Sequence, residues 1–420
     1  MRRRQALVVG LAGLTAACTR PAPEPTPTVL QPTSVASPTA PAQPTAAPAA
    51  VPTAAATPLV PVTAANPTAV RAAETQVDLD IHLWNGDAEV QLDGRTIEPG
   101  HISVPRGPHQ VAALVDGEVA ALADVPPDGG VIDLVVPPAH AALAIMIENQ
   151  ADARPQTGLT SADVVYEALA EGGITRFIAI YLSADAPVVG PVRSLRHYFA
   201  FMAADYGADV VHIGASPEGF AWREAMNMGH LDESAGDPGI WRVRSRPPPH
   251  NAYTDTAADR GFLQQFGRQR NHVWGPLRFD VQAPHGDEVA EQVRLGFLPW
   301  PYRVGYQWDA AQSRYLRSME GGPHLDAASG EQIAPATVVV QFADVEAIPN
   351  DPKLRLDVNL VGGSGDLVVF SGGTRRTGTW TKPAPRSSTR WLDATGKPLV
   401  IPPGPVWVEV MPLESPLTWG

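Results

Sequence analysis

A proline-rich segment near the N-terminus sets the strongest limit on what this chain can fold into. Thirteen prolines fall between Pro21 and Pro67, and residues 19–74 consist almost entirely of Pro, Ala, Thr, Val, Ser and Gln. Proline removes a backbone donor and fixes φ, so neither a helix nor a sheet can propagate through such a stretch. We therefore expect a disordered tether that reaches at most roughly 170 Å when extended. A Pro-rich ligand or an O-glycosylated stalk is the alternative interpretation.

Residues 1–18 have the pattern of an export signal that ends in a lipid attachment site. Three arginines precede a short apolar stretch, Ala6–Ala17, which is too short to span a membrane as a stable helix. The only cysteine of the chain, Cys18, follows two alanines and resembles the acylated cysteine of a bacterial lipobox. The sequence therefore predicts lipidation at Cys18 and a location on the extracytoplasmic face of the bacterial cell membrane. It leaves open whether export uses the general or the twin-arginine route.

Charge and cysteine content exclude several classes of function. The formal net charge of −13 argues against a nucleic-acid partner, which would need a basic surface. A single cysteine excludes a disulfide framework and any multi-cysteine metal site. A pair of histidines with zinc-ligand spacing is absent as well, so we expect no structural metal and no cofactor.

Residues 75–138 have the pattern of a small β-sandwich. Asp78–Leu83 alternates polar and apolar residues, as a half-buried strand does, and Gly-containing turns separate it from several more short segments of this kind. The phrases Asp93-Gly94-Arg95 and Pro105–His109 resemble those of PEGA-type surface modules. That resemblance implies a spacer or docking module without chemistry.

Residues 139–277 alternate predicted strands with predicted helices. The expected strands are Ala142–Ile147, Ile174–Leu182 and Asp209–Ile213. The expected helices are Ser161–Glu171, Pro191–Tyr206 and Pro217–Asn227. Strands that alternate with helices favour an α/β layer with largely parallel strands.

From about residue 278 to residue 420 the pattern is rich in strands again. The predicted fold class is therefore a mixed α+β fold with three parts: a small N-terminal β-sandwich, an α/β layer with largely parallel strands, and a strand-rich C-terminal part. The expected domains are 75–138, 139–277 and 278–420, after the signal at 1–18 and the tether at 19–74.

Several phrases of residues 140–415 carry a family resemblance. They are Ile147-Glu148-Asn149, Ala153–Leu159, Ala162–Glu167, Glu171–Arg176, Gly190–Arg196 with Tyr198, Pro249-His250-Asn251 with Tyr253, Tyr315-Leu316-Arg317, Gly378-Thr379-Trp380, and Pro403-Gly404 with Trp407. Together these phrases resemble the YerB-like lipoprotein family, which is defined by a two-part bacterial domain of unknown function. The resemblance implies an envelope lipoprotein and brings no established activity.

A set of arginines and amides in this region forms the candidate binding site. The predicted ligand-binding residues are Asn149, Arg154, Gln156, Arg176, Arg193, Arg196, Tyr198 and Asn251. Arg193 and Arg196 are spaced i, i+3 at the expected start of a helix, where the helix dipole already favours anions. A carboxylate, phosphate or sulfate ligand would satisfy these arginines, and so would an internal lattice of arginines and carboxylates.

Four residues are candidates for catalysis. Asp163 and Glu167 would form, with Glu171, one acidic stripe on the helix expected over 161–171. His212 follows a strand near Ser216, which we interpret as a helix N-cap, and His250 lies in a Pro- and Arg-rich loop. Asp163 and Glu167 could hold Mg²⁺ only together with a phosphorylated substrate.

Three functional hypotheses follow. The first is a membrane-tethered, non-catalytic protein that binds an anionic cell-wall polymer or another envelope protein in an arginine-lined groove. The second is a metal-assisted enzyme that acts on a phosphorylated envelope glycopolymer or lipid-linked substrate. The third is a scaffold whose charges are all paired internally.

Overall fold

A computed structural model describes residues 76–268, 273–297 and 302–420. The expected export signal, the lipidation site Cys18 and the tether lie outside the described residues. Within these ranges, no helix is both long enough and apolar enough to cross a membrane.

Residues 76–135 fold into two small sheets around a common core. One sheet has the order β4-β1-β7 and the other has the order β3-β2-β5-β6. The strands are β1 (Gln76–Trp84), β2 (Glu89–Leu92), β3 (Arg95–Ile97), β4 (Gly100–Pro105), β5 (Gln110–Val115), β6 (Glu118–Asp124) and β7 (Gly130–Val135). The period-two pattern of β1 turns Leu79 and Ile81 inward, where they pack with Val111 and Leu134.

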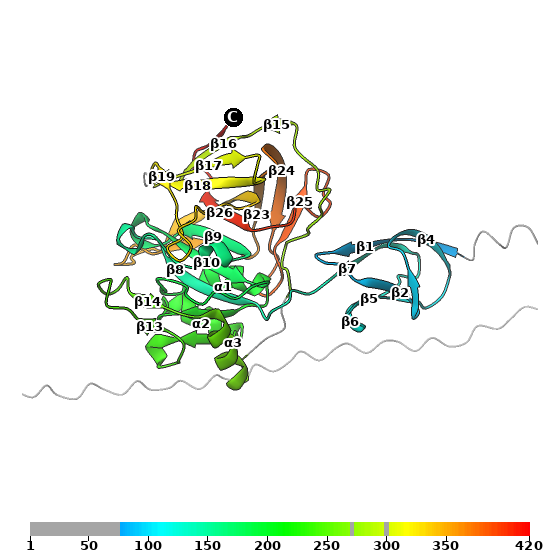
Figure 1. The fold of residues 1–420 in the computed structure, drawn as a ribbon, viewed down its shortest axis with the longest axis horizontal. Coiled ribbons are helices and arrows are strands. Elements are labelled where there is room, and N and C mark those ends of the chain that lie inside the picture. The colour runs from blue at the N-terminus through cyan, green and yellow to red at the C-terminus, as the bar shows by residue number, and fades with distance from the viewer. Residues whose placement is uncertain (1–75, 269–272, 298–301) are drawn as a thin grey trace, which may run out of the picture. The chain divides into compact units, whose positions relative to one another are not determined.

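The rest of the described chain is built on one 11-stranded sheet. Its order is β12-β11-β8-β10-β9-β26-β20-β23-β24-β15, and β25 pairs with β24 (Figure 1). The strands from the first half are β8 (Leu143–Glu148), β9 (Val164–Leu169), β10 (Thr175–Tyr181), β11 (Asp209–His212) and β12 (His230–Asp232). Those from the second half are β15 (Glu288–Val289), β20 (Thr337–Ala343), β23 (Ser364–Ser371), β24 (Thr374–Thr381), β25 (Arg390–Asp393) and β26 (Val406–Pro412).

The two halves meet inside this sheet, at a parallel ladder between β9 and β26. Val164 lies opposite Val406, and Glu167 lies opposite Glu409. Strand β26 also pairs in parallel with β20, and β10 runs antiparallel between β8 and β9. Seven strands of the sheet consequently point the same way, namely β12, β11, β8, β9, β26, β20 and β24. Their carboxyl ends lie along one edge of the sheet, which we call the carboxyl edge.

A separate hydrophobic core covers each face of the sheet. On one face, Tyr166, Ile178 and Val408 pack with the helix α1 (His197–Asp205). On the other face, Phe177, Val338 and Trp407 pack against a five-stranded sheet of order β19-β18-β17-β16-β27. That sheet consists of β16 (Gln292–Phe297), β17 (Tyr302–Asp309), β18 (Arg314–Met319), β19 (Gly322–Pro323) and β27 (Leu417–Trp419). Figure 1 shows α1 and this second sheet on opposite sides of the main sheet.

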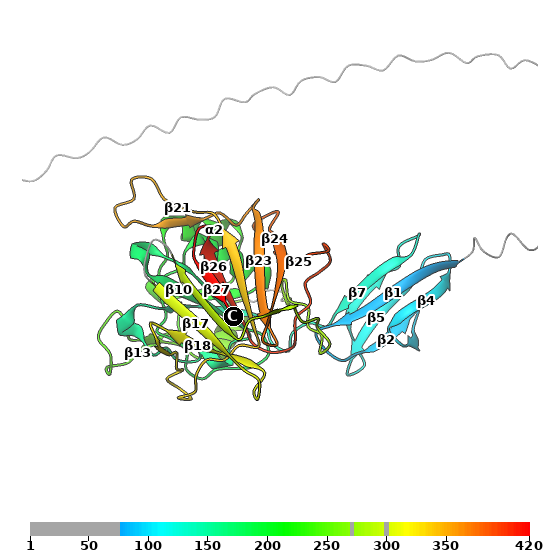
Figure 2. The same ribbon diagram turned by 90° about the horizontal axis from the view of Figure 1, so that it is seen from above.

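The remaining elements are two helices, two short hairpins and several 3-10 turns. The helices are α2 (Pro217–Ala225) and α3 (Thr256–Gln265), and the hairpins are β13 (Trp241–Arg242) with β14 (Ala252–Tyr253) and β21 (Val345–Ala347) with β22 (Leu356–Val358). The 3-10 turns are η1 (Ala151–Ala153), η2 (Leu159–Ser161), η3 (Glu171–Gly173) and η4 (Glu233–Ala235). Figure 2 shows the β21–β22 hairpin projecting from the body.

The predicted fold class is wrong. The described residues contain only three α-helices, strands dominate several sheets, and the expected α/β layer with largely parallel strands is a mixed sheet. The segment expected as a helix over 161–171 contains β9 instead. Val164, Val165 and Tyr166 favour a strand, β10 and β26 pair with its two edges, and the two hydrophobic cores bury its faces.

The helix expected from Pro191 begins only at His197. The preceding segment is extended because its backbone pairs with two strand ends: the amide of Arg193 donates to Met146, and the amide of Leu195 donates to Gly214. Arg193 and Arg196 therefore do not share a helix, and Arg196 is the N-cap residue of α1.

Candidate functional site

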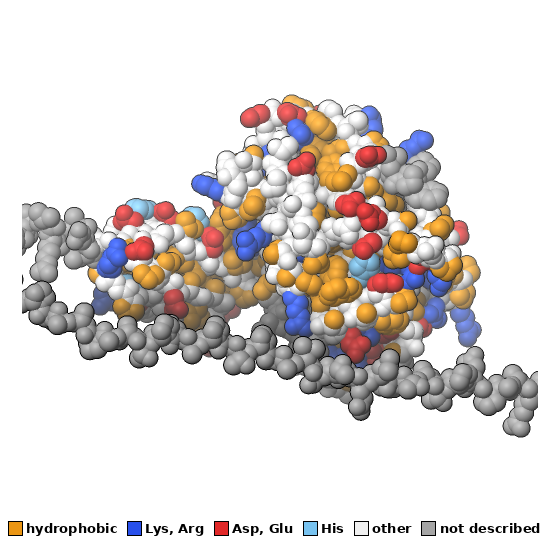
Figure 3. Space-filling view, turned by 180° about the vertical axis from the view of Figure 1, so that it is seen from behind, with side chains coloured by type: hydrophobic (Ala, Val, Ile, Leu, Met, Phe, Trp, Pro, Cys, Tyr) orange, Lys and Arg blue, Asp and Glu red, His pale blue; other side chains and the backbone are white. Residues whose placement is uncertain are grey.

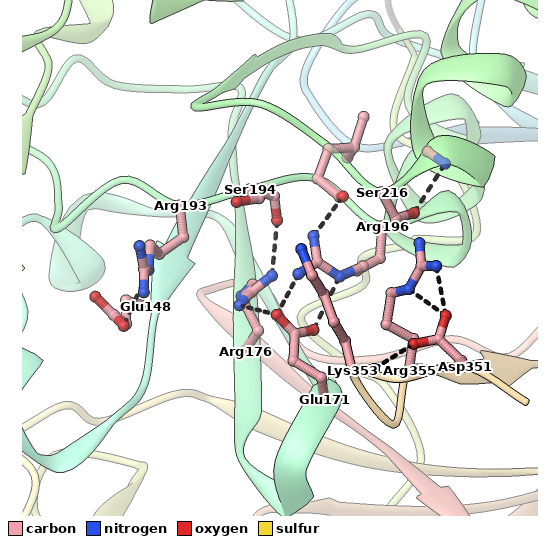
Figure 4. A network of polar contacts seen from close by, with 12 residues as sticks. Glu148, Glu171, Arg176, Arg193, Ser194, Arg196, Ser216, Asp351, Lys353 and Arg355 are labelled. Atoms are coloured by element: carbon pink, nitrogen blue, oxygen red, sulfur yellow. Dashed lines mark hydrogen bonds and ion pairs between the residues drawn. The ribbon is translucent and has the colours of Figure 1, made fainter. Parts of the chain in front are cut away.

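One carboxylate and two arginines lie close together where β9 ends, at the carboxyl edge. Glu171 lies in η3, the turn that follows β9, and Arg176 lies at the start of the neighbouring strand β10. Arg196 comes from the N-cap of α1. We call Glu171, Arg176 and Arg196 the edge cluster (Figure 4).

Both arginines of the edge cluster bind the same carboxylate. Arg196 holds Glu171 with two guanidinium nitrogens, of which Nε lies 2.9 Å from Oε2. Arg176 approaches Oε1 of Glu171 at 3.3 Å and donates at 2.9 Å to the carbonyl of Ser194. The Nε of Arg176 is buried and has no hydrogen-bond partner in the part of the chain described. Two cations thus share one carboxylate.

Burial and charge compete at Glu171. Partial burial favours the protonated acid, but the charges of Arg176 and Arg196 outweigh it and lower the pKa of Glu171 to about 2. Guanidinium groups keep their proton at any ordinary pH. The edge cluster therefore has a net charge of one positive, from two arginines and one carboxylate.

A second group of charges from the β21–β22 hairpin borders the edge cluster. Arg355 binds Asp351 and donates at 3.0 Å to Glu218 of α2. The hydrogen bond with Asp351 raises the pKa of Arg355. The charges of Glu218 and, to a smaller extent, Glu171 raise it further. In Figure 4 the side chain of Lys353 extends toward Arg196. Lys353 is exposed and has no carboxylate within ion-pair distance among the described residues. The hairpin also supplies Asp357 of β22, whose carboxylate lies 2.7 Å from Nε2 of His197, so the unmatched cation belongs to the edge cluster itself.

Arg193 belongs to a different pair. Its Nε lies 3.0 Å from Oε1 of Glu148, the last residue of β8, and Nδ1 of His250 lies 2.9 Å from Oε2 of the same carboxylate. Glu148 and His250 are buried, while about a quarter of the Arg193 side chain is exposed. The candidate base His250 is thus held against a carboxylate that already pairs with an arginine.

A fully buried cluster lies between the two sheets, on the other face of β9. Arg317 of β18 forms an ion pair with Glu167 and lies 3.7 Å from Glu409. Tyr306 donates to Glu409, and none of the three charged side chains is exposed to solvent. We call Glu167, Arg317, Glu409 and Tyr306 the buried cluster.

The two acids of the buried cluster, Glu167 and Glu409, face a single arginine. Burial, and next the charge of Glu167, raise the pKa of Glu409 well above its ordinary value. The neutral form of Glu409 is therefore favoured, which reduces the repulsion between two acids that lie opposite each other on neighbouring strands.

Amide side chains connect the buried cluster to the end of β8. Asn149 donates at 3.1 Å to Glu167 and at 2.8 Å to Thr175, and its oxygen accepts from Arg154 and Gln156. A further contact joins Gln156 to His324, whose ring also contacts Arg317. Asn149 and Gln156 are completely buried, so these residues hold the two halves of the chain together.

The other candidates lie apart from both clusters. Asp163 precedes β9 and accepts from the backbone amides of Leu182 and Ser183, so the structure separates it from Glu167. His212 is buried, and burial lowers its pKa to about 4.

Tyr198 and Asn251 make local contacts. The hydroxyl of Tyr198 donates at 2.7 Å to the carbonyl of Leu169, which ties α1 to the end of β9. Asn251 accepts at 3.0 Å from Arg242. Ser216 caps α2 by accepting from the amide of Gly219.

Sequence reasoning missed the partners that the second half supplies. Arg317, Tyr306 and Glu409 complete the buried cluster, and Lys353 and Arg355 border the edge cluster. Only Arg317 lies in one of the phrases that carry the family resemblance, and nothing in its spacing indicates a contact with Glu167. Within the described ranges, no three His, Cys, Asp or Glu side chains are grouped so that they could hold a metal ion.

Comparisons with known proteins agree on one family. Residues 134–269 match the model described as "Protein of unknown function (DUF3048) N-terminal domain", and residues 293–408 match the corresponding C-terminal domain. The chain is 31% identical over 277 residues to "Putative lipoprotein YerB" of Bacillus subtilis (strain 168), a match that spans 64% of this chain and 81% of that protein. It also resembles the crystal structure of YerB from Bacillus subtilis, with a TM-score of 0.58, 30% identity and coverage of 66% of this chain and 93% of the other.

Proposed function

The chain belongs to the DUF3048 family, and from that premise we propose that it is a lipid-anchored extracytoplasmic protein whose edge cluster binds an anionic ligand of the cell envelope. The proposed anchor is Cys18. The Bacillus subtilis relative carries the name "Putative lipoprotein YerB". In this chain, Cys18 follows the pattern of an export signal. An acidic protein is repelled by an anionic membrane surface, so a covalent anchor is the attachment that fits its charge.

The binding proposal depends on one observation: the edge cluster contains two arginines and only one carboxylate. Arg176 and Arg196 share Glu171, and neither guanidinium can lose a proton to restore balance. Lys353 extends toward the same place. A phosphate or carboxylate group from outside would supply the missing negative charge and accept several charge-assisted hydrogen bonds.

The surface beyond this cluster fits a compact anionic group better than a nucleic acid. On the face shown in Figure 3, lysine and arginine side chains are interspersed with apolar and acidic ones. A nucleic-acid partner would need a continuous basic stripe.

The enzyme hypothesis receives less support from the geometry. It needs Asp163 and Glu167 to hold Mg²⁺ together, but Asp163 accepts from the backbone at residues 182–183 and Glu167 is completely buried against Arg317. The scaffold hypothesis fits Arg193, which pairs one to one with Glu148, but it leaves the extra cation of the edge cluster without a role.

Calorimetry tests the binding proposal. The chain from residue 19 onward is titrated with inorganic phosphate and with phosphate-bearing cell-wall fragments, with and without Mg²⁺. We expect binding that Arg196→Gln weakens about tenfold or more, because a hydrogen bond to a charged group contributes about 1.5–3 kcal/mol. Arg242→Gln is the matched control, since Arg242 also holds a carboxylate, Glu233, with two nitrogens. Absence of heat, or equal weakening by both variants, would refute the proposal. Binding that requires Mg²⁺ would favour the enzyme hypothesis.

Cell fractionation tests the anchor. Replacement of Cys18 by alanine removes the acceptor for the lipid, so we expect the protein to move from the membrane fraction to the soluble fraction. Retention of Cys18→Ala in the membrane fraction would contradict the assignment.

A further inference from the structure

An apolar cavity of about 730 Å³ lies at the carboxyl edge, beside the edge cluster. It is lined by Leu169 and Pro412, the last residues of β9 and β26, and by Asp344, which follows β20. The β21–β22 hairpin supplies further lining residues, Val345, Leu354 and Leu356 among them. The cavity thus occupies the carboxyl ends of three adjacent parallel strands, the position where open sheets commonly bind ligands. We call it the edge cavity.

Two leucines line this cavity and are largely exposed to solvent. Leu354 is 65% exposed and Leu413 is 60% exposed. Leu354 has a φ of +52°, a left-handed conformation that costs a non-glycine residue about 1–2 kcal/mol. A single exposed leucine needs no explanation. Two of them around one apolar cavity, one held in a strained conformation, indicate a surface that is covered by an apolar group.

The edge cavity and the edge cluster are built from the same two segments. Leu169, Gly172 and Gly173 line the cavity on either side of Glu171 in the chain. Leu354 also lines the cavity, and the side chain of its chain neighbour Lys353 extends toward Arg196 (Figure 4). A ligand that fills the cavity and continues along Lys353 would therefore approach the cations of the edge cluster.

Charge determines how such a ligand would be oriented. Asp344 and Glu414 also line the cavity, and neither has a cation within ion-pair distance among the described residues. These carboxylates would repel an anionic group inside the cavity. The favourable place for such a group is the side of Arg196 and Lys353.

We propose that the ligand is a phosphorylated lipid, with its phosphate at Arg196 and Lys353 and its aliphatic chain in the edge cavity. This inference rests on the proposed function and specifies the class of its ligand. The apolar lining would stabilise the chain in proportion to the surface removed from water, and the cations would select the anionic headgroup.

A chain-length series tests the inference. The chain from residue 19 onward is titrated with inorganic phosphate and with butyl, hexyl and octyl phosphate below their micellar concentrations. We expect the Kd to fall about fourfold for each added methylene, because burial of a CH₂ group contributes about 0.8 kcal/mol. Leu354→Asn combined with Leu413→Asn removes the apolar side chains without adding charge, so it should abolish the dependence on chain length while inorganic phosphate still binds. Leu122→Asn, at a leucine of similar exposure in the small β module, is the control and should change neither.

A second variant keeps the test independent of the two exposed positions. Ala347 lines the cavity and is itself exposed, so Ala347→Trp should occupy the cavity without disturbing a core. It should reduce the affinity for octyl phosphate to the level of butyl phosphate.

The outcomes separate the two proposals. No binding of phosphate or of any alkyl phosphate refutes the proposed function together with this inference. Binding with a Kd that does not depend on chain length refutes the lipid inference and leaves the proposed function standing. Equal affinity for octanol and octyl phosphate refutes the role of the cations, and tighter binding of octanoate refutes phosphate as the headgroup.

Discussion

Two clusters of arginine and glutamate lie four residues apart along the chain at β9, and they balance their charges in opposite ways. In the buried cluster, Arg317 faces two acids, Glu167 and Glu409, and no charged side chain is exposed. In the edge cluster, two arginines share Glu171, whose side chain is 29% exposed.

The difference shows which kind of imbalance a protein can correct by itself. An excess of acid is neutralised by a proton, as the raised pKa of Glu409 indicates. An excess of arginine has no such remedy, because guanidinium does not deprotonate. The buried cluster is therefore complete within the chain, whereas the edge cluster lacks an anion. For this reason we assign a structural role to the first and a binding role to the second.

The largest expected effect comes from breaking the buried cluster. Arg317→Met leaves Glu167 without its cation in a site closed to water, so we expect the free energy of unfolding to fall by about 3–5 kcal/mol. Urea denaturation of the chain from residue 19 onward measures the change. Adding Glu167→Gln to Arg317→Met removes the unpaired charge and should restore part of the loss. A double variant less stable than Arg317→Met would contradict the charge argument.

The two clusters should also respond to pH in opposite directions. The folded pKa of Glu171, about 2, is below its unfolded value near 4.5. Its contribution to stability is therefore complete above pH 4.5 and is lost as the pH falls toward 2, by about 2–3 kcal/mol in all. Glu171→Gln should remove this loss, which denaturation curves at several pH values would show. Parallel pH profiles for the variant and the wild type would be evidence against it.

The folded pKa of Glu409 is raised, so the sign is reversed in the buried cluster. Its contribution is complete below pH 4.5 and is lost as the pH rises toward the folded pKa. Relative to Glu409→Gln, the wild type should become less stable with increasing pH. The same titration measures this difference, and a wild type that gained stability over the variant would rule out a neutral Glu409.

The smallest effect on stability is expected at Lys353. This residue is exposed, so Lys353→Gln should change the free energy of unfolding by less than about 0.5 kcal/mol. It should nevertheless weaken binding of inorganic phosphate several-fold, because the ammonium group is part of the proposed site. Lys397→Gln, at another exposed lysine, should leave binding unchanged. Equal binding by Lys353→Gln and the wild type would remove Lys353 from the site.

The sequence pattern predicted those elements whose local signals agree with their surroundings. The strands expected at Ala142–Ile147 and Ile174–Leu182 correspond to β8 and β10, and the helix expected from Pro217 is α2. The fold class failed at residues 161–171, which contain β9 rather than the expected helix. The partner that makes this segment a strand is β26, more than two hundred residues away, and periodicity carries no information about it.

The candidate site shows the same division. Arg176 and Arg196 lie on either side of Glu171, whereas Arg193, which the i, i+3 spacing paired with Arg196, contacts Glu148 instead. The expected helix places Glu167 and Glu171 on one face. In the structure, Glu167 lies in β9 with its side chain buried against Arg317, whereas Glu171 lies in the turn η3 after that strand. Lys353 and Arg355 could not be predicted, because their proximity to Arg196 and Glu171 depends on how the β21–β22 hairpin folds back.

The parallel ladder between β9 and β26 has a consequence for biosynthesis. Strand β26 lies between β9 and β20, so both neighbours keep an open hydrogen-bonding edge until residues 406–412 have been synthesised. Open strand edges pair readily with other chains. The insertion of β26 thus closes the sheet, and a polypeptide that stops before residue 406 would expose two aggregation-prone edges.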